Sequence, residues 1–400
     1  MRLSNDLVMI NNQYEGVLFI YDRLNHIKYE INDEMFFLIS DIHRNELDYD
    51  SIIKKYDKGI IEQLIELNVL VSAVDKPIFN IKEVTEMNCA RIFVEITDKC
   101  NLNCKHCYGG FACNNNTYLS LDTIDELLRQ AIELGVYEFD ITGGEPLLYK
   151  DLEQVLSKLY DAGMLVSIFT NLTLMTEEHL EMFKKYGVKK IITSIDSCYD
   201  HIHDEFRGKK GSFDKTLKNL YLIKESGIEI AVNTMIGNHN IKYIDKMVSF
   251  LKSLEVPFVL DVITNEGRAV GLNEDMNLSA SIIKEIFNKF HNDIDDGANF
   301  KHCGIGKRFI YVKSDMNVYI CPSLIDEKYC VGSLKGKFQL KKIWKTMQDT
   351  FGNLSCSSKC EKCKKCKGGC RARALKLHNN INAIDDVYCT LMKGDLLCIK

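Results

Sequence analysis

The residues best suited to chemistry in this sequence are its cysteines, and three of them lie close together. Cys100, Cys104 and Cys107 are spaced C-x3-C-x2-C directly after an apolar run at 91–96. Three thiolates can hold three irons of a [4Fe–4S] cube, and the fourth iron then has no protein ligand. A structural zinc site closes its fourth position, whereas an open position is where metal sites do chemistry. His106 is poorly placed to close it, because it directly precedes Cys107.

A second and larger group of cysteines occupies the last hundred residues. It comprises Cys303, Cys321, Cys330, Cys356, Cys360, Cys363, Cys366, Cys370, Cys389 and Cys398. Disulfide scaffolds of this density are usually small secreted domains. The chain has 400 residues and begins without the apolar run of a secretory signal, so we expect a reducing, cytoplasmic location. Clustered cysteines there indicate iron–sulfur clusters or zinc. Two complete [4Fe–4S] clusters would use about eight of these thiols.

The composition excludes several other classes of protein. Of the residues, 46% are apolar and 27% are charged, which is the balance of a globular chain with a buried core. No run of about eighteen apolar residues predicts a membrane span, and no membrane partner is expected. The net charge of −5 gives no overall attraction to nucleic acid. In the basic stretch at 359–376 we expect the cations to offset cluster-bound thiolates rather than to bind nucleic acid.

Alternating strands and helices must position the first three cysteines. Between residues 90 and 295, short β-rich runs alternate with amphipathic stretches typical of helices. Strands are expected at 91–96, 137–141, 165–169, 190–195, 228–235 and 257–263, and helices at 123–134, 152–160, 177–185, 215–225 and 243–254. Such βα repeats predict a parallel sheet with right-handed crossovers, either open or curved into a barrel. The cysteine loop then follows the first strand.

The order of these motifs resembles the radical S-adenosylmethionine (SAM) superfamily over residues 90–290. Its signature is C-x3-C-x2-C followed by an aromatic residue, here Tyr108. The resemblance implies an α/β fold, with a partial (βα)6 barrel as the radical SAM core at 90–295. It also implies SAM and a SAM-binding [4Fe–4S] cluster on Cys100, Cys104 and Cys107. Cleavage of SAM would give methionine and a 5′-deoxyadenosyl radical that abstracts hydrogen, while the protein positions and shields the cofactor.

Motifs at the ends of later strands match SAM-contacting segments of the same family. The resemblance assigns SAM contacts to Tyr108, Gly143, Gly144, Glu145, Asn171, Ser194, Asp196 and Arg207. Glycine backbone at 143–145 would approach the cofactor, and the carboxylate would hold its ammonium group. Arg207 would face the SAM carboxylate. The alternative interpretations are a tight turn at 143–146 and a surface salt bridge at Arg207. Leu172 stands where many relatives carry glycine.

The run from Cys360 to Ala374 resembles the auxiliary-cluster domain called SPASM, to which residues 296–400 are assigned. The resemblance implies two auxiliary [4Fe–4S] clusters and three clusters in all. The first would use Cys303, Cys321 and Cys370 with Cys330 or Cys356 as alternative fourth ligands, and the second Cys360, Cys363, Cys366 and Cys389. Zinc knuckles are the competing metal interpretation.

The tail departs from the SPASM pattern at two places. Cys363 and Cys366 are separated by two residues where five are usual, and Met316 stands where a glycine is expected before Cys321. The remaining cysteines are expected to be ordinary buried or spare thiols. These are Cys89, Cys113, Cys198 and Cys398.

Residues 1–75 form a separate acidic segment, with 14 Asp and Glu against 7 Lys and Arg. Strands are expected at 6–10, 17–22 and 26–31, helices at 33–42, 51–56 and 58–68, and a linker at 76–89. This order resembles the leader-recognition element of ribosomal-peptide maturases, a small winged-helix-like α+β domain. In that family a leader peptide adds a strand to an exposed sheet edge. A structural cap on the barrel is the alternative.

Together these resemblances imply a radical SAM/SPASM peptide maturase, similar to sactipeptide and ranthipeptide thioether synthases. It would modify a ribosomally made precursor peptide, forming a thioether between a cysteine sulfur and a carbon with loss of two hydrogens. The alternatives are a carbon–carbon crosslink, oxidation of a tetrapyrrole or other small molecule, and maturation of a folded protein of the sulfatase type. The expected partners are the leader-bearing precursor and an electron donor of flavodoxin or ferredoxin type.

Overall fold

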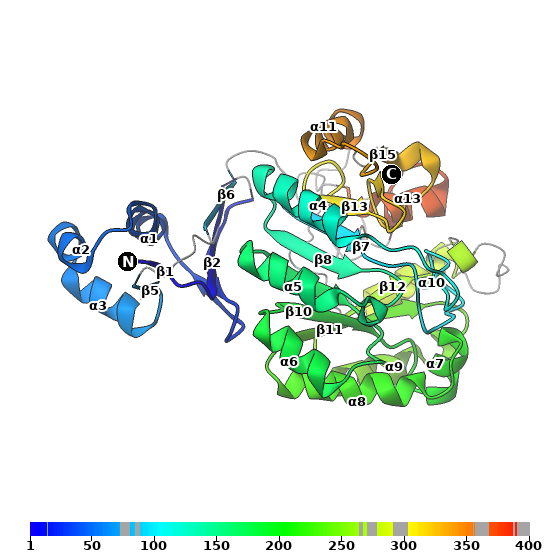
Figure 1. The fold of residues 1–400 in the computed structure, drawn as a ribbon. Helices are drawn as coiled ribbons and strands as arrows, with labels where there is room; N and C mark the ends of the chain where they lie inside the picture. The colour runs from blue at the N-terminus through cyan, green and yellow to red at the C-terminus, as the bar shows by residue number, and fades with distance from the viewer. Residues whose placement is uncertain are drawn as a thin grey trace.

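Strands and helices alternate through the middle of the chain, with a small domain before them and a cysteine-containing region after them (Figure 1). The computed structural model describes residues 1–13, 15–72, 81–84, 89–263, 267–269, 278–290, 303–354, 356, 368–386 and 389. The predicted ligands Cys360, Cys363 and Cys366 lie outside the described residues. Within the described ranges, no helix has the length and apolar character needed to cross a bilayer.

The middle of the chain is a parallel α/β unit. Its strands are β7 (Arg91–Glu95), β8 (Glu138–Thr142), β9 (Leu165–Phe169), β10 (Lys190–Ser194), β11 (Glu229–Ile236) and β12 (Phe258–Val262). Its helices are α4 (Leu121–Glu133), α5 (Leu152–Asp161), α6 (Glu177–Lys185), α7 (Asp200–Arg207), α8 (Ser212–Glu225), α9 (Ile244–Ser253) and α10 (Ala280–Phe290). The strands pair in chain order, and every pair is parallel. The predicted α/β class and the six strands are confirmed.

Local sequence explains most of these helices. In α4 the buried residues Ile124, Leu127, Leu128 and Ala131 repeat at the helical period, and Ser120 Oγ accepts a hydrogen bond from Thr123 N at 3.2 Å as the N-cap. Helices α7 and α10 were not predicted from the sequence. Helix α7 is short and mostly polar, and Ile202 and Phe206 are its only apolar residues, so its sequence is hard to distinguish from a loop.

The central sheet continues into the region assigned to the C-terminal domain. Strand β13 (Phe309–Val312) pairs in parallel with β7, and β14 (Asn317–Tyr319) and β15 (Cys330–Ser333) follow in antiparallel order. The strand order is β12-β11-β10-β9-β8-β7-β13-β14-β15, so the barrel is not closed. Helices α11 (Leu340–Phe351) and α13 (Arg371–His378) belong to the same region. The partial barrel is confirmed, and its sheet extends beyond the expected boundary at 295.

The N-terminal domain contains a four-stranded sheet of order β4-β3-β2-β6 and a two-stranded ladder, β1-β5. The strands are β1 (Arg2–Leu3), β2 (Leu7–Asn12), β3 (Val17–Asp22), β4 (Ile27–Glu30), β5 (Leu70–Val71) and β6 (Ile81–Val84). The helices are α1 (Asp33–Asn45), α2 (Tyr49–Lys55) and α3 (Lys58–Glu66). The three strands and three helices expected from the sequence are present. Part of the expected linker instead forms β6, which pairs in parallel with β2.

The two faces of the N-terminal sheet pack against different partners. Leu7, Met9 and Ile20 face helices α1–α3, which lie on the side away from the barrel (Figure 1). The alternate residues face the barrel, because strand side chains point to opposite faces in turn. That second cluster contains Val8, Ile10, Phe19, Tyr21, Ala90, Tyr137 and Leu165. The last three lie at the start of β7, β8 and β9, so the domain is docked on the N-terminal end of the barrel.

Buried cations reinforce this interface. The side chain of Arg23 is fully buried and donates to the carbonyl oxygen of Tyr160 at 2.7 Å, and its guanidinium lies 3.8 Å from the centre of the Tyr160 ring. Lys82 Nζ on β6 donates to the carbonyl oxygen of Ala162 at 2.9 Å. Burial, with a smaller effect from Arg23, lowers the pKa of Lys82 to about 7. The domain is therefore fixed to the barrel through polar and apolar contacts.

Candidate active site

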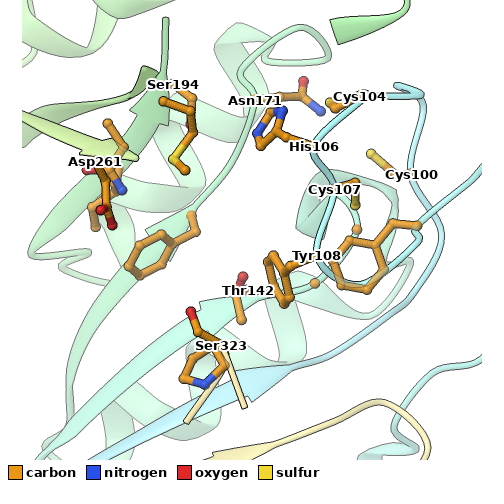
Figure 2. A pocket seen from close by; sticks show the side chains of 18 of the residues that line it. Cys100, Cys104, His106, Cys107, Tyr108, Thr142, Asn171, Ser194, Asp261 and Ser323 are labelled. Carbon is orange, nitrogen blue, oxygen red and sulfur yellow. The ribbon is translucent and has the colours of Figure 1, made fainter. Parts of the chain in front are cut away.

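A cavity of about 440 Å³ lies at the C-terminal ends of the barrel strands (Figure 2). This is the end at which βα enzymes place their chemistry, and the volume is that of a small-molecule site. The predicted site residues that line it are Cys100, Cys104, Cys107, Tyr108, Gly143, Gly144, Asn171, Ser194, Arg207 and Cys370. The cavity is thus shared between the barrel and the C-terminal region.

The three cysteines of the first loop lie at the cavity wall in a largely buried setting. Cys100 Sγ accepts a hydrogen bond from Leu102 N at 3.5 Å, and an Arg207 terminal nitrogen lies 3.9 Å from Cys104 Sγ. Burial raises the pKa of Cys100 to about 12 and also raises the pKa of Cys104. Without a metal these thiols are therefore held in their protonated form, and iron would have to displace the protons on binding.

Close backbone contacts from two other loops hold the cysteine loop in place. A Cβ on Gly144 would lie 2.3 Å from the carbonyl oxygen of Lys99. Gly208, at φ +68°, follows α7, and a Cβ there would lie 2.5 Å from the carbonyl oxygen of Asn103. Only glycine permits this approach. The Gly143-Gly144 pair was expected to approach the cofactor, and the structure shows that its backbone also packs against the cysteine loop.

Arg268 is a third support of the loop that sequence reasoning missed. Its Nε donates to the carbonyl oxygen of Cys104 at 2.9 Å, and its Nη1 to that of Phe111 at 2.6 Å. Its backbone N–H donates to the carbonyl oxygen of Cys107 at 3.0 Å. The only signal in the sequence was its position a few residues after the last barrel strand. These three bonds tie the loop to the opposite edge of the six-stranded barrel.

Glu145 does not line the cavity, in contrast to the expected direct contact with SAM. Its carboxylate is fully buried and accepts hydrogen bonds from Thr170 Oγ1 at 2.6 Å, Asn171 N at 2.8 Å and Leu147 N at 3.1 Å. Burial raises the pKa of Glu145 to about 7, and the hydrogen bonds oppose this shift. The geometry therefore favours a positioning role, because Glu145 fixes the backbone at the end of β9 where Asn171 reaches the cavity.

Asp196 also lies behind the cavity wall and holds Arg207. Its Oδ2 accepts from Arg207 Nε at 2.6 Å, and its Oδ1 accepts from Met235 N at 3.0 Å. Burial opposes ionisation, but the charge of Arg207 holds the pKa of Asp196 well below its usual range. The ion pair is buried, so the surface salt bridge considered for Arg207 is wrong. Within the described residues, Arg207 Nη2 is buried and has no hydrogen-bond partner, which leaves a donor for an anionic group.

The remaining predicted contacts are held by neighbouring side chains. Asn171 Nδ2 donates to Asn101 Oδ1 at 3.0 Å, so this residue links the end of β9 to the cysteine loop. The Tyr108 side chain is hydrogen-bonded to Tyr311 on β13 and to Thr142. Leu172 adopts φ +60°, a left-handed conformation that favours glycine, which is the residue that the family pattern predicts at this position.

A second set of three cysteines comes together beside the same cavity. Cys303 precedes β13, Cys321 follows β14 and Cys370 precedes α13. Burial raises the pKa of Cys321, and the nearby thiols of Cys370 and Cys303 raise it further. Cys321 Sγ accepts from Ser323 N and Cys370 Sγ from Arg373 N, both at 3.5 Å. Cys303, Cys321 and Cys370 therefore lie near one another although they come from three distant segments, and their role as ligands of the first auxiliary cluster stays a prediction.

The two alternative fourth ligands occupy different surroundings. Cys330 lies on β15, and its thiol donates to the carbonyl oxygen of Gly332 at 3.3 Å. Cys356 packs against Gly368, since a Cβ on that glycine would lie 2.8 Å from Cys356 N, and Gly368 is two residues from Cys370. This proximity favours Cys356. Cys389 N donates to the carbonyl oxygen of Asp385 at 2.8 Å.

Ligands of a cube are spaced more widely than ligands of one ion, because each thiolate binds a different iron. Among the described residues, no three His, Cys, Asp or Glu side chains lie close enough together to hold a single metal ion.

The comparisons with known proteins agree with the cavity and its cysteine loop. Residues 94–251 match the family model of the Radical SAM superfamily. The chain contains a radical SAM domain. Curated relatives include the AdoMet-dependent heme synthase of Methanosarcina barkeri, which is 32% identical over 161 residues, or 40% of this chain and 46% of that protein. The subtilosin biosynthesis protein AlbA of Bacillus subtilis is 33% identical over 161 residues, or 40% of this chain and 36% of AlbA.

The solved structures extend the likeness beyond the radical SAM domain. SuiB of Streptococcus suis bound to S-adenosylmethionine superposes with a TM-score of 0.63 at 15% identity, covering 97% of this chain and all of SuiB. The complex of SuiB with its precursor peptide SuiA gives a TM-score of 0.62 at 14% identity, with 97% and 99% covered. At this identity the likeness shows the fold alone. The heme synthase of Methanosarcina barkeri and AlbA are each matched over less than half of their length.

The residues at the cavity fit the two groups that the radical SAM domain implies. Cys100, Cys104 and Cys107 would hold a [4Fe–4S] cluster, and the unpartnered Arg207 Nη2 is suited to the carboxylate of SAM. When bound, the cluster and SAM supply the radical that abstracts hydrogen. The protein holds the loop, keeps Arg207 in position through Asp196, and encloses the reacting groups between the barrel and the C-terminal region.

Proposed function

We propose that the chain modifies a ribosomally made precursor peptide, and that the product is a thioether between a cysteine sulfur and a carbon. The observation that carries the proposal is the second cysteine triad, since Cys370 lines the same cavity as Cys100, Cys104 and Cys107. Joining a C–H carbon to a thiol sulfur removes two hydrogens in all. One leaves as a hydrogen atom, and the other leaves as a proton and an electron. The triad of Cys303, Cys321 and Cys370 is positioned to hold a redox centre for that electron.

The N-terminal domain supports a peptide substrate. Strand β4 forms one edge of its sheet, and all four of its residues are exposed. Ile27 and Tyr29 are 45% exposed each, which is unusual for apolar side chains on a strand. A leader peptide would add a strand at this edge through backbone hydrogen bonds, with these side chains contacting it. The solved complex of SuiB with SuiA is a precedent for a precursor peptide on this fold. The opposite sheet face caps the barrel, so the domain would serve both purposes.

Mass spectrometry of the precursor, after reaction with reconstituted enzyme, SAM and a flavodoxin or ferredoxin as the electron donor, tests the product. We expect a loss of two hydrogens together with a cysteine that no longer reacts with iodoacetamide. Tandem fragmentation would place the bond. A loss of two hydrogens with the cysteine still alkylatable would contradict the thioether and favour a carbon–carbon crosslink. An unchanged precursor would contradict peptide modification.

Fluorescence anisotropy of a labelled leader peptide tests the leader site. The double variant Ile27→Ser, Tyr29→Ser should weaken binding by at least about tenfold, because it removes two apolar contacts. Tyr221→Ser on α8 is the matched control, since Tyr221 is 41% exposed but lies on the barrel. Equal affinity for all three proteins would contradict the proposed edge. Deleting residues 1–75 is a poorer test, because it leaves β6 without β2 and uncovers the barrel face of Ala90 and Tyr137.

A second candidate is the oxidation of a tetrapyrrole, which the 32% identity to a heme synthase favours. The two candidates make opposite predictions for a porphyrin substrate. Incubation with iron coproporphyrin under reducing conditions, followed by absorption spectroscopy and mass spectrometry, would show decarboxylated or otherwise altered porphyrin if this candidate holds. The peptide proposal predicts an unchanged porphyrin spectrum. Maturation of a folded protein would instead require a substrate without a leader.

A further inference from the structure

We propose that Asp261 is the residue that binds the substrate peptide inside the cavity, by accepting a hydrogen bond from a neutral N–H, O–H or S–H donor. The inference deepens the proposed function and rests on it. Asp261 lies on β12, the edge strand of the barrel, and lines the cavity. Figure 2 shows it on the side of the cavity opposite Cys100, Cys104 and Cys107. A group at this wall lies on the far side of the cavity from the cysteine loop.

The carboxylate of Asp261 is held in place through one of its oxygens only. Oδ1 accepts from Val262 N at 2.8 Å and from Arg373 Nη1 at 3.1 Å. Within the described residues, Oδ2 has no partner. The side chain is 51% exposed, although Arg373 beside it is only 14% exposed. A carboxylate that lines a cavity and keeps one oxygen without a partner is a ready acceptor for a ligand.

The position of Arg373 does not depend on Asp261. Asp385, which is 1% exposed, accepts from Arg373 Nε at 2.8 Å and from Arg373 Nη2 at 2.9 Å. Asp385 also accepts from Cys370 N at 2.6 Å. The order Cys370, Asp385, Arg373, Asp261 therefore forms a continuous set of contacts from the second cysteine triad to the free oxygen. A substrate donor bound at Asp261 would lie close to that triad.

The charged side chains that line the cavity indicate which kind of substrate donor Asp261 would accept from. Among the described residues that line the cavity, Asp261 is the only carboxylate, whereas the lining contains four cationic side chains, Arg207, Arg268, Arg373 and Lys376. Arg373 is shared between Asp261 and Asp385, but the four cations of the lining outnumber its single carboxylate. A lysine or arginine of the substrate would therefore be repelled, and a neutral donor such as a backbone amide or a cysteine thiol is favoured. This contact would orient the peptide so that one C–H bond faces the site of the radical.

The alternative is that Asp261 has a purely structural role. The ion pair between Asp261 and Arg373 joins the open edge of the barrel to α13, and it could act only as a clasp between them. Asp261→Asn keeps an oxygen that can accept from Val262 N and Arg373, so it retains the two hydrogen bonds of the clasp and removes the negative charge. Asp261→Glu keeps the charge but displaces it. Glu229→Gln is the control, since Glu229 forms an ion pair with Lys190 at the other end of the neighbouring strands.

The experiment compares these holoenzymes with a leader-bearing peptide deuterated at its reacting residue. The measured quantity is the ratio of deuterium in 5′-deoxyadenosine to SAM cleaved, and anisotropy of a leaderless core peptide gives binding without turnover. Loss of a hydrogen bond to a charged group should lower the ratio and the core-peptide affinity by at least about tenfold in Asp261→Asn. Asp261→Glu should recover part of both, and Glu229→Gln should match the wild type.

Three outcomes would overturn the proposal. Unchanged coupling and affinity in Asp261→Asn would reduce Asp261 to a clasp. A lower melting temperature with unchanged core-peptide affinity would do the same. If the wild-type enzyme transfers no deuterium from any peptide while it still cleaves SAM, the peptide function itself fails and this inference fails with it. The first two results leave the peptide function intact, so the two failures are distinguishable.

Discussion

The two cysteine triads beside the cavity are similar in chemistry and different in construction. Each contains largely buried thiols, and in each a backbone N–H donates to a sulfur, as Leu102 N does to Cys100 and Ser323 N to Cys321. Such hydrogen bonds tune the properties of cluster-bound sulfur. The first triad comes from one short loop. The second comes from a segment before β13, a segment after β14 and the residue before α13.

This difference determines what holds each triad together. The first loop is a local feature that the barrel clamps from outside, through Gly144, Gly208 and Arg268. The second triad has no loop of its own, so its geometry depends on the register of β13 against β7 and on the position of α13. The contrast teaches that the contacts that clamp the first triad come from the barrel and its loops, whereas the second triad requires the C-terminal region to dock correctly.

The largest expected effect is a difference in SAM cleavage between variants of the two triads. Changing Cys100, Cys104 and Cys107 together to Ala should remove about four irons per chain and all SAM cleavage, because no ligands remain for that cluster. Changing Cys303, Cys321 and Cys370 to Ala should also remove about four irons but should retain SAM cleavage and lose the crosslinked peptide. Iron analysis and chromatography of 5′-deoxyadenosine after anaerobic reconstitution measure both. SAM cleavage that survives in the first variant would refute the assignment of the loop.

A smaller effect tests the clamp on the first loop. Gly208 and Gly211 both adopt positive φ, +68° and +78°, but a Cβ on Gly211 would meet nothing within 4 Å. Either change to Ala should cost about 1 kcal/mol of backbone strain. Gly208→Ala should in addition displace Asn103 and lower the iron retained at the first loop severalfold. Equal iron content in the two variants would show that the contact with Asn103 does not support the loop.

Much of this architecture was predictable because it follows from local sequence. The six parallel strands have apolar runs, and the first triad lies within one motif directly after β7. Leu172 and Met316, the two positions where a glycine was expected, show most clearly how a family pattern reflects local backbone conformation. Both residues adopt positive φ, +60° and +71°, so the glycines expected there reflect backbone conformation. Met316 meets that requirement in the turn between β13 and β14.

The parts that could not be predicted depend on contacts between distant segments. Nothing local marks Arg268 as a clamp or Asp261 as a cavity residue, since both roles arise from the approach of β12 and its following loop to other elements. The motif at 143–145 predicted a carboxylate at the site, but whether it points into the cavity or behind it is decided by Thr170 and Asn171, which follow another strand, β9. Pairing of β13 with β7 is equally non-local.

The last prediction concerns stability. It tests Glu145, which lies behind the cavity wall, without relying on the cysteines of the first triad. Burial places the pKa of Glu145 at about 7 in the folded chain, whereas a glutamate exposed to water in the unfolded chain has a pKa of 4.5. Below pH 4.5 both states carry the proton, and the stabilisation from the neutral carboxyl is fully present. As the pH rises from 4.5 to 7, the unfolded state loses its proton first, so stability falls by about 3 kcal/mol. Glu145→Gln should therefore remove this fall. The melting temperature of the iron-free variant should change less between pH 4.5 and 7 than that of the iron-free wild type. A slope identical to the wild type would show that the carboxylate is ionised throughout, as its three hydrogen-bond donors would favour.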